Sequence, residues 1–433
     1  MVISARLNGF AAASLASVAV LGVLCISGCG DSSSPSSGAN SSAKTAQAGE
    51  NSASLPTASI ANASQAAPDG NVEPASNVTA ASVEAQASNG GSPEATLQEM
   101  ITLFGKPLPQ GTPEAQADRL RRRNQQLIDM AHQVIAKTHS DKAREPLFNK
   151  AVQFLAEARL KLATNGSQED AKALSDDAQA LYRRDPNSVA AADGAFAVAR
   201  LAHTNAQLSR TEPKFIQQFA IQARLFATRF PRDARALQLL SAAGQTCELY
   251  HMDSEAVSCF SLLKENFAKS PQAAQANAVL RRLELKGKPL DLGGETRDGG
   301  FAKIDDFRGK PTLIVFWASD SESCQEMLPQ LQRVLRPYGK ASLAVIGVCL
   351  DENDKAMDEF IEKNGLSWTQ IFYSDPNRRH WDHPLVQAYG VHDIPTIWLV
   401  NSEGVVVDTH VTPNSLDGQL KYLQASAGQT TRQ

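Results

Sequence analysis

The pattern of hydrophobic and polar positions changes three times along the 433 residues of the chain. An apolar run from Phe10 to Cys25 comes first, and a segment rich in serine, alanine and asparagine follows it. From about residue 95 apolar side chains recur at helical spacing, as at Phe148, Val152 and Leu155, and no alternating pattern competes there. After residue 286 short apolar runs alternate with helical stretches. These changes predict a multi-domain protein, with an all-α domain at 95–286 followed by an α/β domain at 287–427.

Three turns within the all-α domain are similar to one another. Each contains a proline, at Pro186, Pro231 or Pro271, which an aromatic residue precedes by four or five positions and an alanine-rich helix follows. The pattern weakly resembles tetratricopeptide-type repeats, although its period exceeds their usual ~34 residues. It predicts stacked helical hairpins. Because proline is common in the first turn of any helix, an irregular helical domain remains an open alternative.

The first 28 residues have the parts of a secretory signal, with a positive charge at Arg6 ahead of the apolar run. That run is shorter than the ~20 residues that cross a bilayer, and Gly22 interrupts it. The tetrapeptide from Ile26 to Cys29 resembles the lipobox of bacterial lipoproteins. The resemblance implies cleavage before Cys29 and attachment of a diacylglycerol to its sulfur. An ordinary secretory signal and a short membrane span are the alternatives.

Residues 29–94 contain mostly small and polar side chains and almost no aromatic ones. Such a segment cannot bury enough apolar area to offset its conformational entropy, so we expect a disordered tether. Lipid on Cys29 would hold the mature protein at the membrane. We therefore expect a lipid-anchored protein of the cell envelope, on its extracytoplasmic (periplasmic) side.

Charge and cysteine content exclude two classes of protein. The 42 Lys and Arg residues against 46 Asp and Glu residues give a formal net charge of -4, without the strong basic field of a nucleic-acid-binding protein. Besides Cys25 and Cys29 the chain has cysteines only at 247, 259, 324 and 349, too few for a fold of this length held by disulfides. Cys247 and Cys259 flank a predicted turn. They are expected either to pair across it or, more simply, to be buried core thiols.

The α/β domain has a predicted order of elements that begins with a hairpin turning at Asp298-Gly299-Gly300. After it we expect strands at 312–317, 343–350, 370–373, 397–400 and 405–408, and helices at 321–337, 354–364, 384–389 and from about 415. Strand, helix, strand, then two antiparallel strands and a final helix is a thioredoxin-type arrangement.

Several ordered motifs support the same arrangement. They are Gly287-Lys288-Pro289-Leu290, Asp305-Asp306-Phe307-Arg308-Gly309-Lys310-Pro311, Phe316-Trp317-Ala318, Pro329, Tyr389-Gly390-Val391, Ile394-Pro395-Thr396 and Asn401-Ser402-Glu403-Gly404. Together they resemble the membrane-anchored thioredoxins of the TlpA/ResA and redoxin group, over about residues 287 to 425. The resemblance implies a thioredoxin-like fold and, if the site is active, a thiol-disulfide oxidoreductase. It implies protein or peptide thiols and disulfides as partners, and neither a cofactor nor a metal.

At the site that this resemblance locates, the chain departs from the family. Members carry Trp-Cys-x-x-Cys, whereas this sequence reads Asp320-Ser321-Glu322-Ser323-Cys324. Cys324 therefore stands at the position of the resolving sulfur and Ser321 at that of the attacking sulfur. Serine is a good helix cap but cannot form a mixed disulfide.

The resemblance also implies a substrate groove. Ile394 and Pro395 would form a cis-proline loop that, with Trp317, docks an extended peptide beside the sulfur. A trans proline that opens a strand is the alternative.

Three functions stay open for such a site. Cys324 can act as a monothiol, with Cys349 as a possible resolving thiol because it ends a strand expected beside 312–317; a buried core thiol is the alternative for Cys349. The domain can instead be a non-catalytic module that binds peptides or proteins. A thiol peroxidase is a minor alternative, because Ser321-x-x-Cys324 resembles the Thr-x-x-Cys of peroxiredoxins. The proline expected four residues earlier, however, is Trp317.

Other charged and titratable residues suggest weaker hypotheses. His380 and His383 flank a Trp-Asp pair, but no third ligand at convincing spacing supports a metal site. His392 is expected either near Cys324 or on an exposed loop. The arginines at 119 and 121–123 are predicted to form a solvated helix face rather than a lipid-binding patch.

Overall fold

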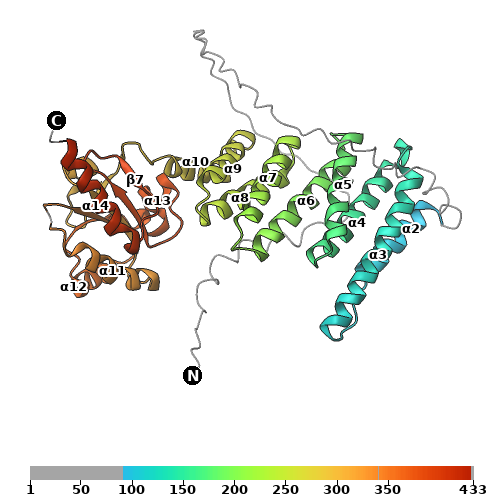
Figure 1. Cartoon of the computed structure of the whole chain (residues 1–433), viewed down its shortest axis with the longest axis horizontal. Helices are drawn as coiled ribbons and strands as arrows, with labels where there is room; N and C mark the ends of the chain where they lie inside the picture. Colours follow the sequence, from blue (N-terminus) through green and yellow to red (C-terminus); the bar gives the residue numbers. More distant parts are fainter. Residues whose placement is uncertain (1–90, 340, 431–433) are drawn as a thin grey trace, which may run out of the picture. The chain divides into compact units, whose positions relative to one another are not determined.

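The computed structural model describes residues 91–339 and 341–430, with side chains as far as residue 425. The signal segment, Cys29 and almost all of the tether lie outside the described residues. Residues 93–283 are helical, and the strands begin after them, at residue 293 (Figure 1). The predicted order of an all-α domain and an α/β domain is confirmed.

The helices of the first domain follow one another with short connections. They are α2 (Pro93–Gly105), α3 (Pro113–Thr138), η3 (Lys142–Arg144), α4 (Glu145–Thr164), α5 (Gln168–Arg184), α6 (Val189–Leu208), α7 (Pro213–Arg229), α8 (Ala234–Leu249), α9 (Asp253–Asn266) and α10 (Pro271–Leu283). Serine and threonine hydroxyls cap several N-termini: Ser92, Ser188 and Ser270 each accept a hydrogen bond from a backbone N–H in the first turn. These caps fix where the helices begin.

The three similar turns each join two helices, α5 to α6, α7 to α8 and α9 to α10, and consecutive helices pack against one another (Figure 1). The helical hairpins predicted from these turns are therefore present. Alanines and phenylalanines fill the core between them, including the fully buried Phe219 and Phe226. Gly244 on α8 lets α9 approach closely, because a Cβ there would lie 2.7 Å from the ring of Phe260.

Cys247 and Cys259 belong to this core. Both side chains are fully buried and neither forms a disulfide. Burial raises the pKa of Cys247 to about 11 and that of Cys259 to about 12, so both are inert thiols at neutral pH. The interpretation as core thiols is confirmed.

The second domain contains a hairpin and a five-stranded mixed sheet. The hairpin pairs β1 (Gly293–Glu295) with β2 (Phe301–Lys303), and its turn is the predicted Asp298-Gly299-Gly300. The sheet consists of β3 (Thr312–Trp317), β4 (Ala344–Cys349), β5 (Thr369–Ile371), β6 (Thr396–Val400) and β7 (Val406–Asp408), in the order β5-β4-β3-β6-β7. β4 runs parallel to β3 and β5, whereas β6 is antiparallel to β3 and β7.

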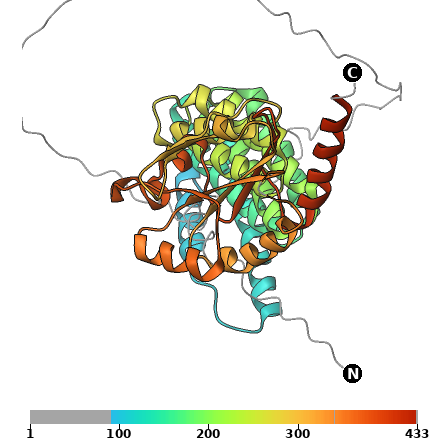
Figure 2. The same cartoon turned by 90° about the vertical axis from the view of Figure 1, so that its left-hand side faces the viewer.

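Helices cover both faces of this sheet. They are α11 (Glu322–Leu335), α12 (Asp354–Asn364), α13 (Pro384–Tyr389) and α14 (Pro413–Thr430), with short 3-10 turns η4 (Ile304–Phe307), η5 (Pro376–Arg378) and η6 (His380–Asp382). Figure 2 faces this domain, and the red helix that ends at the C-terminus is α14. Alternate residues of β3 enter two cores: Leu313, Val315 and Trp317 pack with α11, α12 and α14, whereas Ile314 and Phe316 pack with α13 and the hairpin.

Candidate functional site

The candidate site begins where β3 ends. Trp317 is the last residue of the strand, and Ser321 caps α11 four residues later. The Ser321 backbone is extended, and its hydroxyl accepts a hydrogen bond from the N–H of Cys324 at 3.3 Å. Ser321 therefore occupies the half-exposed cap at the start of the helix, the position where an attacking sulfur would gain from the helix N-terminus.

Cys324 lies one turn inside α11 and has no exposed surface. Burial raises the pKa of its thiol, and hydrogen bonds from Ser321 and the Ala318 backbone only partly oppose this effect. The negative charges of Asp351 and Asp320 raise the pKa further. Cys324 is thus a protonated, sealed thiol at neutral pH, which is unfavourable for direct attack on a disulfide or a peroxide.

A second thiol lies nearby, at the end of β4. Cys349 pairs in register with Trp317 and is fully buried, and it shares the core that contains Cys324. Burial raises the pKa of Cys349 well above its ordinary value, and the negative charge of Asp351 raises it further. Cys324 is close enough that its thiolate would add to this effect. The prediction that Cys349 ends a strand adjacent to β3 is confirmed; its role as a resolving thiol stays a prediction.

Sequence reasoning missed Asp351, two residues after Cys349. One carboxylate oxygen accepts the N–H of Ser319 at 2.7 Å, and the other is buried without a partner. Burial raises its pKa, while the hydrogen bonds from Ser319 and Cys349 oppose the shift. A signal was available, because Asp351 follows the strand next to β3 and so reaches the sheet edge where the Ser319 loop begins.

The loop before β6 lies at the same edge. Thr396 pairs with Phe316 of β3, and the preceding Ile394–Pro395 peptide bond is cis, as the resemblance implied. Ile394 and Pro395 are half-exposed, and no hydrogen bond joins the Ile394 backbone to another residue in the described part of the chain. The Ile394–Pro395 segment therefore enters β6 at the same end of the sheet where β3 leads into α11.

The expectation that Trp317 contacts substrate is not supported. Its side chain has no exposed surface and packs on Phe360, with ring centroids 5.3 Å apart. Its indole N–H donates to Gln370 Oε1 at 3.1 Å. Helices cover both faces of β3, and the alternation along the strand places Trp317 in the core beneath α11 and α12, so it stabilises that core instead of lining a groove.

His392 does not reach Cys324. Its ring bonds Glu248 of α8 at 2.7 Å, and this hydrogen bond is the main reason why its pKa is raised. Glu248 also pairs with Arg282 of α10, and their side chains are only 3% and 4% exposed. Arg282 in turn donates to the carbonyl oxygens of Tyr389 and Gly390. The helical domain therefore contacts the loop that leads to Pro395, which helical periodicity alone could not reveal.

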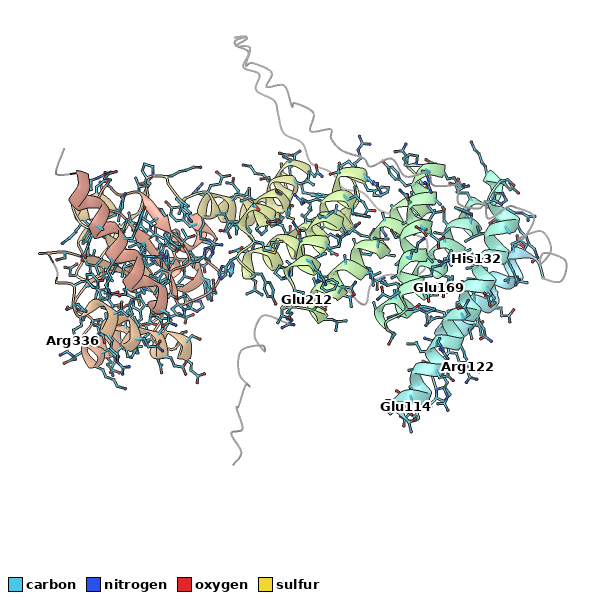
Figure 3. All side chains as sticks on the ribbon, viewed as in Figure 1. Glu114, Arg122, His132, Glu169, Glu212 and Arg336 are labelled. Atoms are coloured by element: carbon cyan, nitrogen blue, oxygen red, sulfur yellow. The ribbon has the colours of Figure 1, made fainter. Side chains whose placement is uncertain are left out.

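The remaining clusters have structural roles. Burial lowers the pKa of His383 to about 4, and its Nδ1 accepts the N–H of Leu385 at the start of α13. Among residues 91–339 and 341–430 no group of three His, Cys, Asp or Glu side chains could hold a metal ion. Arg121 and Arg122 pair with Asp118 on the exposed part of α3, where Arg122 points outward (Figure 3).

These observations define a thioredoxin-fold domain in which a serine stands at one of the two positions where a two-sulfur site has cysteines. Comparison with known proteins agrees with this class: residues 309–406 match the Thioredoxin-like family. Curated relatives are thiol-disulfide oxidoreductases. ResA of Halalkalibacterium halodurans is 23% identical over 116 residues, which are 27% of this chain and 62% of that protein. ResA of Bacillus anthracis is 25% identical over 129 residues, or 29% of this chain and 70% of that protein.

Sporulation thiol-disulfide oxidoreductase A of Bacillus subtilis is 27% identical over 117 residues, which cover 26% of this chain and 66% of that protein. The chain spans about three fifths of the length of the first of these relatives. Among solved structures, the thioredoxin domain of a thiol-disulfide oxidoreductase from Bacteroides vulgatus is 21% identical and covers 32% of this chain and 97% of its own, with a TM-score of 0.29. The family match and the curated relatives show that the domain has a thiol-disulfide oxidoreductase-like thioredoxin fold.

Proposed function

We propose that the thioredoxin-like domain docks extended segments of partner proteins beside Ser321 and does not perform the two-sulfur reaction of its relatives. One observation carries this proposal. The half-exposed cap of α11 is a hydroxyl, and the sulfur one turn later is sealed and protonated. Since serine makes no mixed disulfide, the step that begins disulfide exchange has no exposed sulfur to perform it.

The loop before β6 supports docking. The backbone N–H and C=O of Ile394 have no partner among the residues described, and the side chains around them are half-exposed. An extended peptide can pair with such a backbone segment, and alternate side chains then give specificity. The partners would be proteins with thiols or disulfides, because the relatives carry the name of thiol-disulfide oxidoreductases.

A trapping experiment tests docking separately from turnover. The double variant Ser321→Cys/Cys324→Ala carries an attacking thiol at the cap and no resolving thiol, so a docked disulfide peptide should remain covalently attached. The matched control is Ser323→Cys/Cys324→Ala, with the thiol two residues further on. Each rate of adduct formation with the peptide is divided by the rate of the same thiol with cystine, which removes the difference in thiol ionisation. We expect this normalised rate to be at least about tenfold higher at position 321 than at 323. Equal normalised rates would show that no peptide is positioned beside the cap.

Exchange that Cys324 begins and Cys349 resolves is the second candidate, and it is supported by the position of these two thiols in one core cluster, although their burial opposes it. In that reaction the Cys324 thiolate attacks a substrate disulfide and releases one substrate thiol. The Cys349 thiolate then attacks Cys324, releases the second thiol and leaves a Cys324–Cys349 disulfide. The substrate is reduced by two electrons and the pair is oxidised by two. Incubation with cystine followed by mass spectrometry tests it: a 324–349 disulfide would favour this candidate over docking alone.

We further infer that the protein is a lipoprotein of the cell envelope, anchored through Cys29 on the periplasmic side. The lipobox-like tetrapeptide and the tether composition support this proposal. In the part of the chain that the structure describes, no helix has the length and apolar character to cross a membrane. Mass spectrometry of the mature N-terminal peptide is the test. We expect a diacylglycerol thioether on Cys29, and an unmodified cysteine or an uncleaved signal would contradict the proposal.

A further inference from the structure

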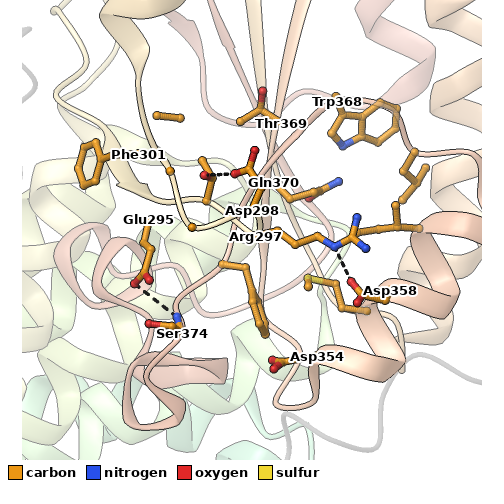
Figure 4. Close-up of a pocket in the computed structure, with 18 of the residues that line it drawn as sticks. Glu295, Arg297, Asp298, Phe301, Asp354, Asp358, Trp368, Thr369, Gln370 and Ser374 are labelled. Carbon is orange, nitrogen blue, oxygen red and sulfur yellow. Dashed lines mark hydrogen bonds and ion pairs between the residues drawn. The ribbon is translucent and has the colours of Figure 1, made fainter.

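A groove of about 850 Å³ lies at the β5 edge of the sheet, between the β1–β2 hairpin and α12 (Figure 4). Neither Ser321 nor Cys324 lines it. Its floor comes from Trp368 to Gln370, and its walls come from the hairpin turn and from one side of α12. The groove is therefore distinct from the site at the start of α11.

The floor presents a hydrogen-bond donor of fixed orientation. Gln370 is only 5% exposed, and its Oε1 accepts the indole N–H of Trp317 at 3.1 Å. Since an indole N–H can only donate, the oxygen of the amide must face Trp317 and its nitrogen must face the other way. That nitrogen is buried without a partner. A Cβ on Gly347 would overlap the Gln370 amide, so glycine at this position allows the arrangement.

Trp368 adds a second unpaired donor. Its indole nitrogen is buried and has no hydrogen-bond partner. Gln370 and Trp368 both line the groove, and Figure 4 labels both side chains. Two buried donors without an acceptor are costly to leave unsatisfied, at roughly 1–3 kcal/mol each. An acceptor oxygen of a ligand that reaches the groove floor would satisfy them.

The rim of the groove is acidic. Five carboxylates line it against two guanidinium groups, and both arginines are already paired, Arg297 with Asp358 and Arg379 with Asp354. Glu295, Asp298 and Asp306 have no ion pair with a Lys or Arg side chain in the described structure. The unbalanced charge at the groove mouth is therefore negative and favours a cationic ligand.

An aromatic side chain stands beside this charge. Phe301 of β2 is 62% exposed, which is unusual for a large apolar residue on a strand. The ammonium of Lys303 already lies 5.9 Å from the centre of its ring, so this ring accepts a cation in the folded chain. The wall of the groove can thus pack the aliphatic part of a long basic side chain.

We propose that this groove binds a basic peptide segment of a partner protein. A main-chain carbonyl of the peptide accepts hydrogen bonds from Gln370 and Trp368, and a lysine or arginine side chain lies against Phe301 with its charge near Glu295 and Asp298. A peptide supplies the acceptor and the cation together, whereas an acidic ligand would be repelled. This interaction needs no sulfur, so it is independent of the chemistry at Cys324.

The test measures binding of the full chain in detergent to labelled nonapeptides by fluorescence anisotropy. One pool has lysine or arginine at alternate positions among random residues, and a matched pool has glutamate there. We expect the basic pool alone to contain binders, with affinity that falls as salt is raised. Equal binding of the acidic pool, or no binder in the basic pool, would overturn the proposal. Competition by spermidine at the affinity of the best peptide would also overturn it, in favour of a small polycation.

Variants localise the binding. Glu295→Gln and Asp298→Asn should each weaken the best peptide by about two- to fivefold, the effect of one exposed ion pair. Trp368→Phe keeps an aromatic ring, smaller than the indole, and removes the donor, and should weaken binding by roughly three- to tenfold. Glu403→Gln, an exposed carboxylate outside the groove, is the matched control. Circular dichroism checks that the two rim variants keep the fold. If Glu403→Gln then weakens binding as much as they do, the groove is not the site.

Discussion

Restoring the missing sulfur should restore disulfide exchange. In Ser321→Cys the new thiol sits at the half-exposed cap of α11, where Ser321 now accepts the Cys324 N–H. There the backbone N–H groups and the positive end of the helix favour its thiolate. Cys324, three residues later, is then the buried resolving thiol that a two-sulfur reaction requires. We therefore expect the variant to carry out the two-sulfur reaction that, on our proposal, the wild type does not perform.

The size of the effect follows from ionisation. The pKa of Cys324 lies above its ordinary value of 9.0, so at pH 7 fewer than about one in a hundred of these thiols is ionised. A cysteine at a helix N-cap with a pKa near 7 is about half ionised at that pH. The gain in thiolate alone is thus at least about fiftyfold, and exposure adds to it. Loss of the serine cap should cost about 1 kcal/mol of stability.

Reduction of insulin by dithiothreitol, followed by turbidity, measures this gain. We expect Ser321→Cys to accelerate the reaction and the wild type to leave it at the uncatalysed rate. Ser323→Cys is the matched control, because it adds a thiol to the same turn at a position that cannot serve as the cap. The reasoning would be refuted if the Ser321→Cys protein is folded and its new thiol can be labelled and oxidised, yet insulin reduction is not accelerated. A wild type that matches the variant would refute it as well.

Three further predictions concern stability. Arg282→Ala leaves the buried Glu248 with only His392 as a cationic partner and should lower the free energy of unfolding in urea by about 3 kcal/mol, whereas an unchanged midpoint would contradict a buried pair. The hydrogen bond to Glu248 raises the pKa of His392, so wild type should be more stable than His392→Gln at low pH. This difference in the free energy of unfolding should have its full value below pH 6.5 and disappear as the pH rises through the raised pKa. A difference that grows with pH would contradict the prediction. Gly244→Ala should cost about 1–3 kcal/mol through its clash with Phe260, and an unchanged thermal unfolding midpoint would contradict this close approach.

Much of the α/β domain could be predicted because its sequence pattern is local. The apolar strand 312–317, the helix 354–364 and the Asp298-Gly299-Gly300 turn appear where their patterns placed them. The three turns of the helical domain were also visible, because a proline and an aromatic residue mark each one. Serine at the cap of α11 could be interpreted in the same way, since capping depends on neighbouring residues only.

Features that depend on packing between distant segments could not be predicted. Trp317 was expected to face substrate, but helices cover both faces of β3, and the buried indole N–H donates a hydrogen bond to Gln370. His392 was considered as a neighbour of Cys324, yet it binds Glu248, a residue 144 positions earlier in the chain. A histidine before the proline loop carries no sequence signal of a partner on α8. The unpaired donors of Gln370 and Trp368 likewise depend on contacts that only the folded chain defines.

The central claim, that the Cys324 thiol is sealed and protonated, is tested most directly by the reactivity of Cys324 in the native wild-type protein. Native protein is treated with N-ethylmaleimide at neutral pH, and each cysteine is then quantified by peptide mass spectrometry, with unfolded protein as the reference. A sealed, protonated thiol should label at least about a hundredfold more slowly in the native state, as should the equally buried Cys349. Labelling of Cys324 within minutes in folded protein would contradict the account, because a reachable sulfur would then be available for exchange.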